Sequence, residues 1–185
     1  MSTDHDPNET PSVLLVFAHP DDEAFGLAGT LARLREEGIR AVLICTTRGE
    51  VGEISSDRLA TPSTIGAVRE MELRAAMALV GVDDIRFLGY RDSGMDGTPE
   101  NDDPRSFHKA PFEEVVAQLV AQIRAIRPVT VITFGEDGIY GHPDHVAVYH
   151  AMAAAIPAAA DPDQPIGLGV PYRVPVTYFA AVARE

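Results

Sequence analysis

Two uninterrupted apolar runs constrain the fold of this chain most. Residues 12–18 (SVLLVFA) and 40–46 (RAVLICT) are apolar almost without a break. That pattern is typical of strands covered on both faces of a parallel sheet. A helical pattern lies between the two runs, at 24–37, which is the crossover that two parallel strands need. The sequence therefore predicts a strand–helix–strand unit with a right-handed crossover.

The same alternation continues along the rest of the chain. Apolar residues recur at helical spacing at 65–80, at 112–126 and from 143 to about 155, and further strands are predicted at 84–88, 129–134 and 174–183. We expect an α/β fold, a Rossmann-like, doubly wound and mostly parallel sheet with helices on both faces. A long loop at 89–110, dense in Gly, Asp and Pro, is typical of a lid or binding loop.

Composition narrows the class of protein. The chain has 185 residues, 45% of them apolar, which fits a single domain at 12–185 preceded by a flexible polar tail at 1–11. A net charge of −13 makes nucleic acid a poor partner. The lone cysteine, Cys45, lies in a predicted buried strand, and no export signal or long apolar run precedes or follows it. We expect a cytoplasmic protein without a membrane span, for which a homo-oligomer stays open.

Two similar motifs stand where two of the predicted strands end. A-H-P-D-D-E occupies 18–23 after the first strand, and G-H-P-D-H occupies 141–145 after the strand at 129–134. Binding sites in open α/β sheets form outside the carboxyl ends of the strands. A dinucleotide site would need a glycine-rich turn after the first strand, where this chain has three carboxylates that repel phosphate.

The spacing inside these motifs predicts a metal site. His19 and Asp22 stand three residues apart, as do His142 and His145, so each pair shares one face of a helical first turn. Three of these four residues with one open position make a catalytic metal site, and the spacing leaves open which one stays off the metal. Asp21 is suited to act as the general base. The plainer alternative is that the Asp residues only cap helices.

At this point the two motifs identify a family resemblance. A-H-P-D-D-E and G-H-P-D-H, together with T-R-G-E at 47–50 and R-E-M-E-L at 69–73, resemble the PIG-L/LmbE family of zinc-dependent N-deacetylases. R-D-S-G-M at 91–95 is most similar to the mycothiol branch, the acetylglucosaminyl-inositol deacetylase and the mycothiol conjugate amidase. The resemblance implies an LmbE-like domain that uses Zn²⁺, with Fe²⁺ as another divalent candidate. It implies a small-molecule amino-sugar substrate that loses its N-acetyl group.

The resemblance also implies roles for individual residues. His19, Asp22 and His145 become the metal ligands, and Asp21 becomes the general base. His142 then faces the tetrahedral intermediate, where it protonates the leaving amine or stabilises charge.

Further residues take part through the same resemblance. Asp144 orients the His142 ring, and Tyr140 polarises the acetyl carbonyl as part of an oxyanion hole. Contacts to sugar hydroxyls are implied for Glu50, Arg69 and Asp92. The plainer alternatives are packing of Tyr140 under a lid, a solvated loop charge at Glu50, pairing of Arg69 with Glu70 or Glu72, and turn capping by Asp92.

Two other functions compete with deacetylation of an aminosugar. One is an amidase that cleaves a larger amide, such as a mycothiol-type thiol conjugate, with the same chemistry. The other is a catalytically silent ligand-binding module. Family members continue for some tens of residues past the last predicted strand, and that part helps to build the substrate pocket. We therefore expect this chain to be either a short member of the family or a chain that lacks this C-terminal part.

Overall fold

One parallel sheet organises the chain. The computed structural model describes residues 10–181. Its strands are β1 (Ser12–Phe17), β2 (Arg40–Cys45), β3 (Asp84–Phe87), β4 (Thr130–Phe134) and β5 (Val176–Ala180). They pair in the order β3-β2-β1-β4-β5, and every pairing among these strands is parallel. The predicted α/β fold is confirmed.

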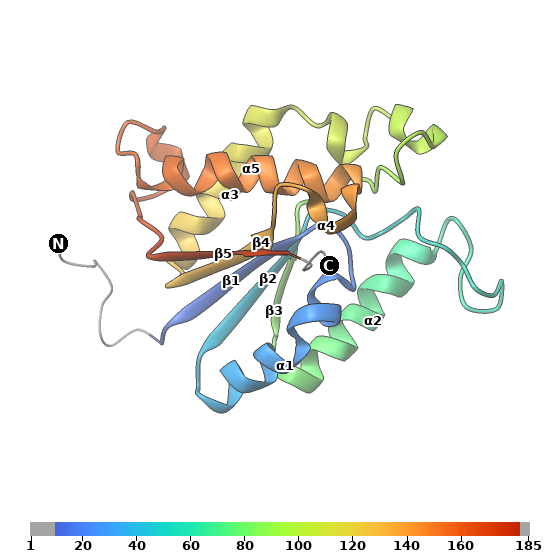
Figure 1. Ribbon diagram of the computed structural model, residues 1–185, viewed down its shortest axis with the longest axis horizontal. Helices are drawn as coiled ribbons and strands as arrows, with labels where there is room; N and C mark the ends of the chain where they lie inside the picture. Colours follow the sequence, from blue (N-terminus) through green and yellow to red (C-terminus); the bar gives the residue numbers. More distant parts are fainter. Residues whose placement is uncertain (1–9, 182–185) are drawn as a thin grey trace.

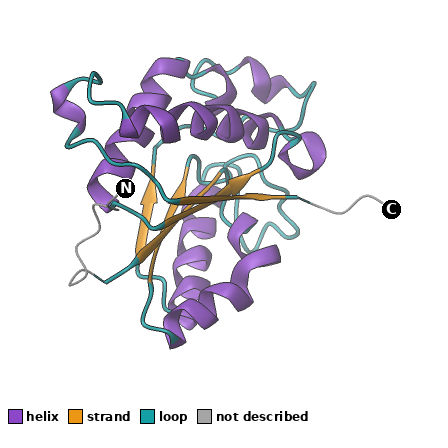
Figure 2. Cartoon of the chain, turned by 60° about the vertical axis from the view of Figure 1, so that its left-hand side comes forward, coloured by secondary structure: helices purple, strands orange, loops and turns teal. Residues whose placement is uncertain are grey.

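Helices cover the sheet on both faces. The helices α1 (Asp22–Glu36) and α2 (Ile65–Val80) lie on one face, and α3 (Phe112–Ile126) and α5 (Pro143–Ala160) lie on the other (Figure 1). The sheet forms the middle of three layers when the molecule is turned (Figure 2). The shorter helical segments are η1 (Pro99–Asp102), η2 (Phe107–Lys109), α4 (Gly138–Gly141) and η3 (Ile166–Leu168).

The apolar runs form the core. All six residues of β1 are buried, and Leu14 and Val16 are fully inaccessible to solvent, because helices cover that strand from both sides. In α3 the buried side chains recur at helical spacing, as at Val115, Leu119 and Ile123. Cys45 is free and buried at the end of β2. Apolar residues that do not alternate therefore mark the central strands, as the sequence predicted.

Two predicted elements end three or more residues away from where the structure ends them. The helix expected from 143 to about 155 continues to Ala160, through Pro157. Pro157 stands in the last turns of α5, where its missing N–H removes only one hydrogen bond from the helix. The strand expected at 174–183 spans only Val176–Ala180, since Pro175 has no N–H for the ladder; residues 182–183 lie outside the described part of the chain, as do 1–9 of the predicted tail.

The strand order brings the two motifs together. From β1 the chain adds β2 and β3 on one side and then β4 and β5 on the other, so the strand order reverses between the parallel neighbours β1 and β4. The segments that follow these two strands therefore meet at the carboxyl edge of the sheet, at the point where α/β proteins bind ligands. No helix within residues 10–181 has both the length and the apolar character to cross a membrane.

Candidate active site

Two imidazoles and a carboxylate form a triangle at this edge. His19 Nδ1 lies 3.2 Å from His145 Nε2 and 3.6 Å from Asp22 Oδ2, and His145 Nε2 lies 3.3 Å from Asp22 Oδ1. Ligands about 2.0–2.1 Å from a tetrahedral zinc ion are separated by about 3.3 Å. The three side chains therefore have the spacing of three ligands around one ion.

Backbone contacts hold two of these side chains in place. The backbone N–H of His19 donates to Asp22 Oδ2 at 2.8 Å, and His145 Nδ1 lies 3.1 Å from the carbonyl oxygen of Gly138. A proton on His145 Nδ1 donates to that carbonyl and leaves the Nε2 lone pair for a metal. Gly138 has φ +58°, and an added Cβ would lie 2.8 Å from His145 Cβ, so only glycine allows this approach.

Two further carboxylates surround the other nitrogen of His19. Its Nε2 lies 3.1 Å from Asp144 Oδ2 and 3.5 Å from Asp92 Oδ1. Burial alone would lower the pKa of His19, but hydrogen bonds to Asp144 and Asp92 raise it to about 10. Asp144 is fully buried and also accepts hydrogen bonds from the backbone N–H and the hydroxyl of Ser93. These carboxylates fix the orientation of the His19 ring.

His142 stands beside this cluster as the N-cap of α5. Its Nδ1 accepts a hydrogen bond from the backbone N–H of Asp144 at 3.1 Å, so a neutral ring carries its proton on Nε2. Burial, followed by the charge of His19, lowers the pKa of His142 to about 4. Asp144 therefore contacts the His142 ring through its backbone, while its carboxylate lies on His19. The contact between Asp144 and the His142 ring is thus made by the backbone N–H of Asp144.

Asp21 occupies the N-cap of α1, but its side chain makes no capping hydrogen bond. Its carboxylate accepts instead from Arg69 Nη2 at 2.7 Å, with half of the side chain exposed. Burial raises the pKa of Asp21, and the Arg69 charge opposes that rise. The backbone of Asp21 has φ +126°, which is outside the helical geometry that the spacing implied. Such a conformation costs about 1–3 kcal/mol, which contacts with surrounding residues must offset.

Arg69 is engaged with the loops around Asp21. Besides that carboxylate, it donates to the carbonyl oxygens of Pro20 at 2.6 Å and Gly49 at 3.2 Å. A Cβ at residue 49 would lie 1.9 Å from Arg69 Nη1, so glycine makes room for the guanidinium. The alternative pairing of Arg69 with Glu70 is not what the structure shows, because Glu70 contacts other arginines, Arg48 and Arg74.

Asp92 and Glu50 join two loops near His19. Asp92 accepts hydrogen bonds from the backbone N–H groups of Gly94 at 2.8 Å and Val51 at 3.2 Å, so it does cap a turn. The carboxylate of Glu50 accepts from the backbone N–H of Asp92 at 3.1 Å. The pKa of Asp92 is held well below its usual range: burial opposes this, but the hydrogen bond and charge of His19 outweigh it.

A cavity of about 650 Å³ opens beside these groups. His19, Asp21, Asp92 and His142 line it, together with Tyr140, whose side chain is 62% exposed and whose ring centroid lies 5.0 Å from that of His145. Burial, followed by the Asp22 charge, raises the pKa of Tyr140, so the phenol stays protonated at neutral pH. The structure therefore brings nine of the ten predicted site residues around this cavity or the triangle of His19, Asp22 and His145, with Glu50 attached through Asp92.

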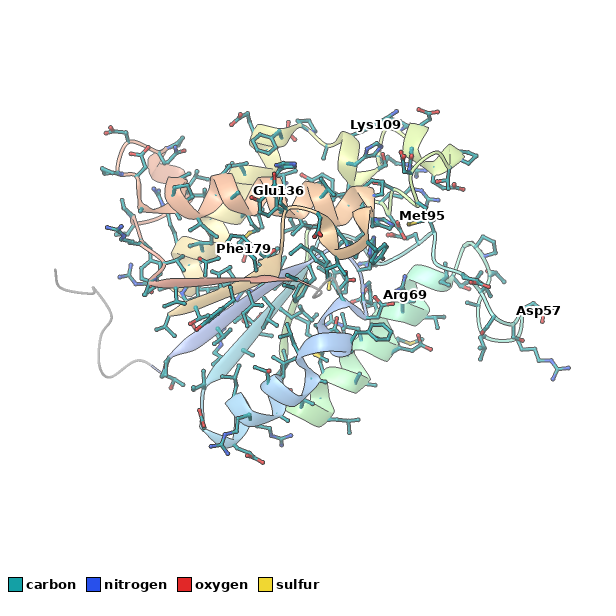
Figure 3. All side chains as sticks on the ribbon, in the orientation of Figure 1. Asp57, Arg69, Met95, Lys109, Glu136 and Phe179 are labelled. Atoms are coloured by element: carbon teal, nitrogen blue, oxygen red, sulfur yellow. The ribbon has the colours of Figure 1, made fainter. Side chains whose placement is uncertain are left out.

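Sequence reasoning did not find the apolar side of the cavity. It is formed by the loop residues Val51, Ile54, Leu59 and Met95, which follow no periodic pattern, and by Ile65 and Val68 of α2, whose helical spacing predicted a helix and not a cavity wall. Figure 3 shows Arg69 at the start of α2 and Met95 on the loop after β3, at the same end of the sheet, with Asp57 farther out on the loop that follows β2. Ser93 was missed as a partner of Asp144, although it lies inside the R-D-S-G-M segment.

Known proteins match this chain over most of its length. Residues 14–156 match the PIG-L family model, described as GlcNAc-PI de-N-acetylase. The chain is 45% identical to a 1D-myo-inositol 2-acetamido-2-deoxy-alpha-D-glucopyranoside deacetylase of Geodermatophilus obscurus, covering 95% of this chain and 64% of that protein. The protein of the same name from Thermobispora bispora is 43% identical, with 94% and 60% covered. The chain thus spans less than two thirds of the length of these relatives.

Solved structures show the same architecture. A conserved protein from Thermus thermophilus superposes with a TM-score of 0.69 at 30% identity, over 94% of this chain and 67% of that one. The N,N'-diacetylchitobiose deacetylase from Pyrococcus horikoshii gives a TM-score of 0.67 at 25% identity, over 84% and 52%. A Pseudomonas hydratase at 22% identity shares the fold alone, so the fold by itself does not determine the reaction. The match over residues 14–156 shows that this chain belongs to the PIG-L family.

Proposed function

We propose that this chain is a metal-dependent hydrolase that removes the N-acetyl group from a glucosamine-containing small molecule. The observation that carries the proposal is the triangle of His19, Asp22 and His145, with Asp21 and His142 beside it on one cavity. Relatives named as deacetylases of an acetamido sugar support the same substrate class.

The donor set fits a divalent metal ion. Two imidazoles and one carboxylate lie within 3.2–3.6 Å of one another, which is the chemistry of a catalytic zinc site with an open position. We propose Zn²⁺ as the ion, with Fe²⁺ as the alternative that the same ligands suit. A zinc ion held there supplies a water of pKa about 7 and polarises the amide carbonyl.

Asp21 is the proposed general base. Burial makes its carboxylate more basic than an exposed one, and Arg69 fixes the direction in which it points. The proton that Asp21 accepts from the attacking water is the proton that the leaving amine needs. One carboxylate on the cavity wall can thus serve both halves of the hydrolysis.

His142 and Tyr140 are the proposed donors to the developing oxyanion. The hydrogen bond from the backbone N–H of Asp144 keeps the proton of neutral His142 on Nε2, and the ring lines the cavity. Tyr140 keeps its phenol proton and stands over the same cavity. Two neutral donors in fixed positions stabilise negative charge without a proton transfer.

Asp92 and Arg69 line the cavity and stay proposed contacts for sugar hydroxyls. Glu50 acts in this proposal through Asp92, whose backbone it holds. A second candidate function is hydrolysis of a larger amide, favoured by the apolar side of the cavity around Leu59 and Met95, which offers contact to an apolar group. The reaction at the metal is the same for both.

The test measures both products. Zinc-loaded protein is incubated with a panel of N-acetylglucosaminides and of larger thiol-conjugate amides, and acetate and primary amine are measured separately. Equal release of acetate and amine, lost on chelation and in Asp21→Asn, is expected. Amine released without acetate, from the larger amides only, would favour the second function. No hydrolysis by protein that binds one equivalent of zinc would contradict both.

A further inference from the structure

The backbone of the proposed general base depends on a buried acid that has no role in the mechanism above. Glu23 is 1% exposed, in the first turn of α1. Its Oε2 accepts a hydrogen bond from the backbone N–H of Asp21 at 3.2 Å. A buried carboxylate is costly unless it is paired, so this position needs a reason beyond starting a helix.

Asp21 needs such a partner because its backbone is strained. Its φ of +126° lies where L-residues are rare, and the residue is not glycine. At this φ its N–H is directed to the Glu23 carboxylate, while its carbonyl oxygen accepts from the N–H of Ala24 at 2.9 Å and so begins α1.

The side chain of Asp21 is fixed from the opposite direction. Arg69 reaches its carboxylate at 2.7 Å and the preceding carbonyl, of Pro20, at 2.6 Å. All three polar groups of Asp21, the N–H, the C=O and the carboxylate, are therefore bonded to the protein. Loss of the Glu23 contact leaves the peptide that precedes Asp21 held only at the Pro20 carbonyl, by Arg69. The peptide can then rotate toward an ordinary φ, which turns the carboxylate away from its present position.

We propose that Glu23 is a positioning residue, which holds the strained Asp21 backbone through its carboxylate oxygen and thereby aims the general base at the cavity. The proposal rests on the proposed function for its effect on rate. It does not need the negative charge of Glu23, because an amide oxygen accepts the same N–H bond. Glutamine at this position therefore keeps the contact, and leucine, of similar size, removes it.

The test compares Glu23→Leu, Glu23→Gln and the exposed helix control Glu36→Leu, all loaded with zinc. For Glu23→Leu we expect kcat to fall about 10- to 100-fold with little change in KM, as for a catalytic group displaced by about 1 Å. Glu23→Gln and Glu36→Leu keep the wild-type kcat. Zinc content of one equivalent and a cooperative thermal transition identify folded protein.

A second readout needs no substrate. Amide hydrogen exchange, followed by NMR, is measured at Asp21 and at Ala24, whose N–H bonds to the Asp21 carbonyl. Faster exchange at Asp21 alone in Glu23→Leu, restored in Glu23→Gln, is expected. Wild-type exchange at Asp21 and wild-type kcat in Glu23→Leu would overturn the positioning role. If the wild-type protein hydrolyses no substrate, but Glu23→Leu and Glu23→Gln show the expected exchange at Asp21, only the proposed function is contradicted.

Discussion

Substitution of two glycines in one short helix separates backbone strain from damage to the metal centre. Gly138 and Gly141 begin and end α4, with φ of +58° and +83°. A Cβ at Gly138 would lie 2.8 Å from His145 Cβ and 3.0 Å from the backbone nitrogen of Val146, whereas a Cβ at Gly141 meets nothing within 4 Å. Gly138→Ala and Gly141→Ala therefore share the cost of a positive φ, and only Gly138→Ala adds a steric clash.

The magnitudes follow from these two terms. A left-handed backbone conformation costs an L-residue about 1–2 kcal/mol, so the unfolding free energy of both variants falls by this amount. Gly138→Ala adds the cost of overpacking, about 1–3 kcal/mol, because its nearest neighbours are a backbone atom and the Cβ of a buried residue that cannot rotate away. We expect Gly141→Ala to lose about 1–2 kcal/mol and Gly138→Ala about 2–5 kcal/mol of unfolding free energy.

The metal centre gives the second difference. The Gly138 carbonyl fixes the His145 ring at 3.1 Å, so displacement of this segment misdirects a proposed ligand. We expect Gly138→Ala to bind zinc about 10- to 100-fold more weakly, and Gly141→Ala to bind it as the wild type does. Urea unfolding of chelated protein gives the stabilities, and competition with a chromophoric chelator gives the zinc affinities. Equal stabilities and equal zinc affinities in the two variants would refute this reasoning.

Three further predictions follow from charged and titrating groups. Arg86 and Arg40 lower the pKa of Asp84, so its stabilisation is complete above about pH 4 and disappears as pH falls through the folded-state pKa. Asp84→Asn should cost about 0.5–1 kcal/mol in urea unfolding at pH 7, and a loss that does not shrink as the pH falls below about 4 would contradict this. Burial raises the pKa of Asp21 and the Arg69 charge opposes that rise, so Arg69→Met should raise this pKa further and move the acidic limb of the kcat/KM profile to higher pH. A limb that stays in place or moves to lower pH would exclude Asp21 as its source. The pKa of His142 is about 4, so its ring NMR signals should not titrate between pH 5.5 and 8, and a midpoint near 6.5 would refute its role as a neutral donor.

The fold and the place of the site could be predicted because both depend on local patterns. Continuous apolar runs identified β1 and β2 as covered strands. The rule that ligands bind outside the carboxyl ends of the strands then placed the two His-Pro-Asp motifs in one site, and the strand order makes the two strands neighbours. The long loop after β3 was also marked by its composition, and it contributes Asp92 and Met95 to the cavity.

The spacing left open which of the four candidates would stay off a metal ion, because the free lone pair on each imidazole depends on single hydrogen bonds. His142 Nδ1 is occupied by the N–H of Asp144, while His145 Nδ1 contacts the Gly138 carbonyl, and both contacts depend on the turn that joins β4 to α5. Residues 51 positions apart in the chain, Ser93 and Asp144, meet only in the folded protein.

Asp21 illustrates the same limit. Its place before a helix suggested a helical or capping residue, but the contacts with Arg69, 48 positions away, and with buried Glu23 hold it at a positive φ. Tertiary contacts of this kind override the local preference of the sequence, and they gather at sites where chemistry requires accurate geometry.

Anomalous diffraction from zinc-loaded crystals tests the central claim most directly. The account predicts one zinc peak at about 2.0–2.2 Å from His19 Nδ1, His145 Nε2 and a carboxylate oxygen of Asp22, with His142 Nε2 outside bonding distance. Within residues 10–181, two other clusters also have ligand spacing, His19 with Asp92 and Asp144, and His19 with His142 and His145. A zinc peak bonded to the Asp92 and Asp144 carboxylates, or directly to His142, would contradict the account.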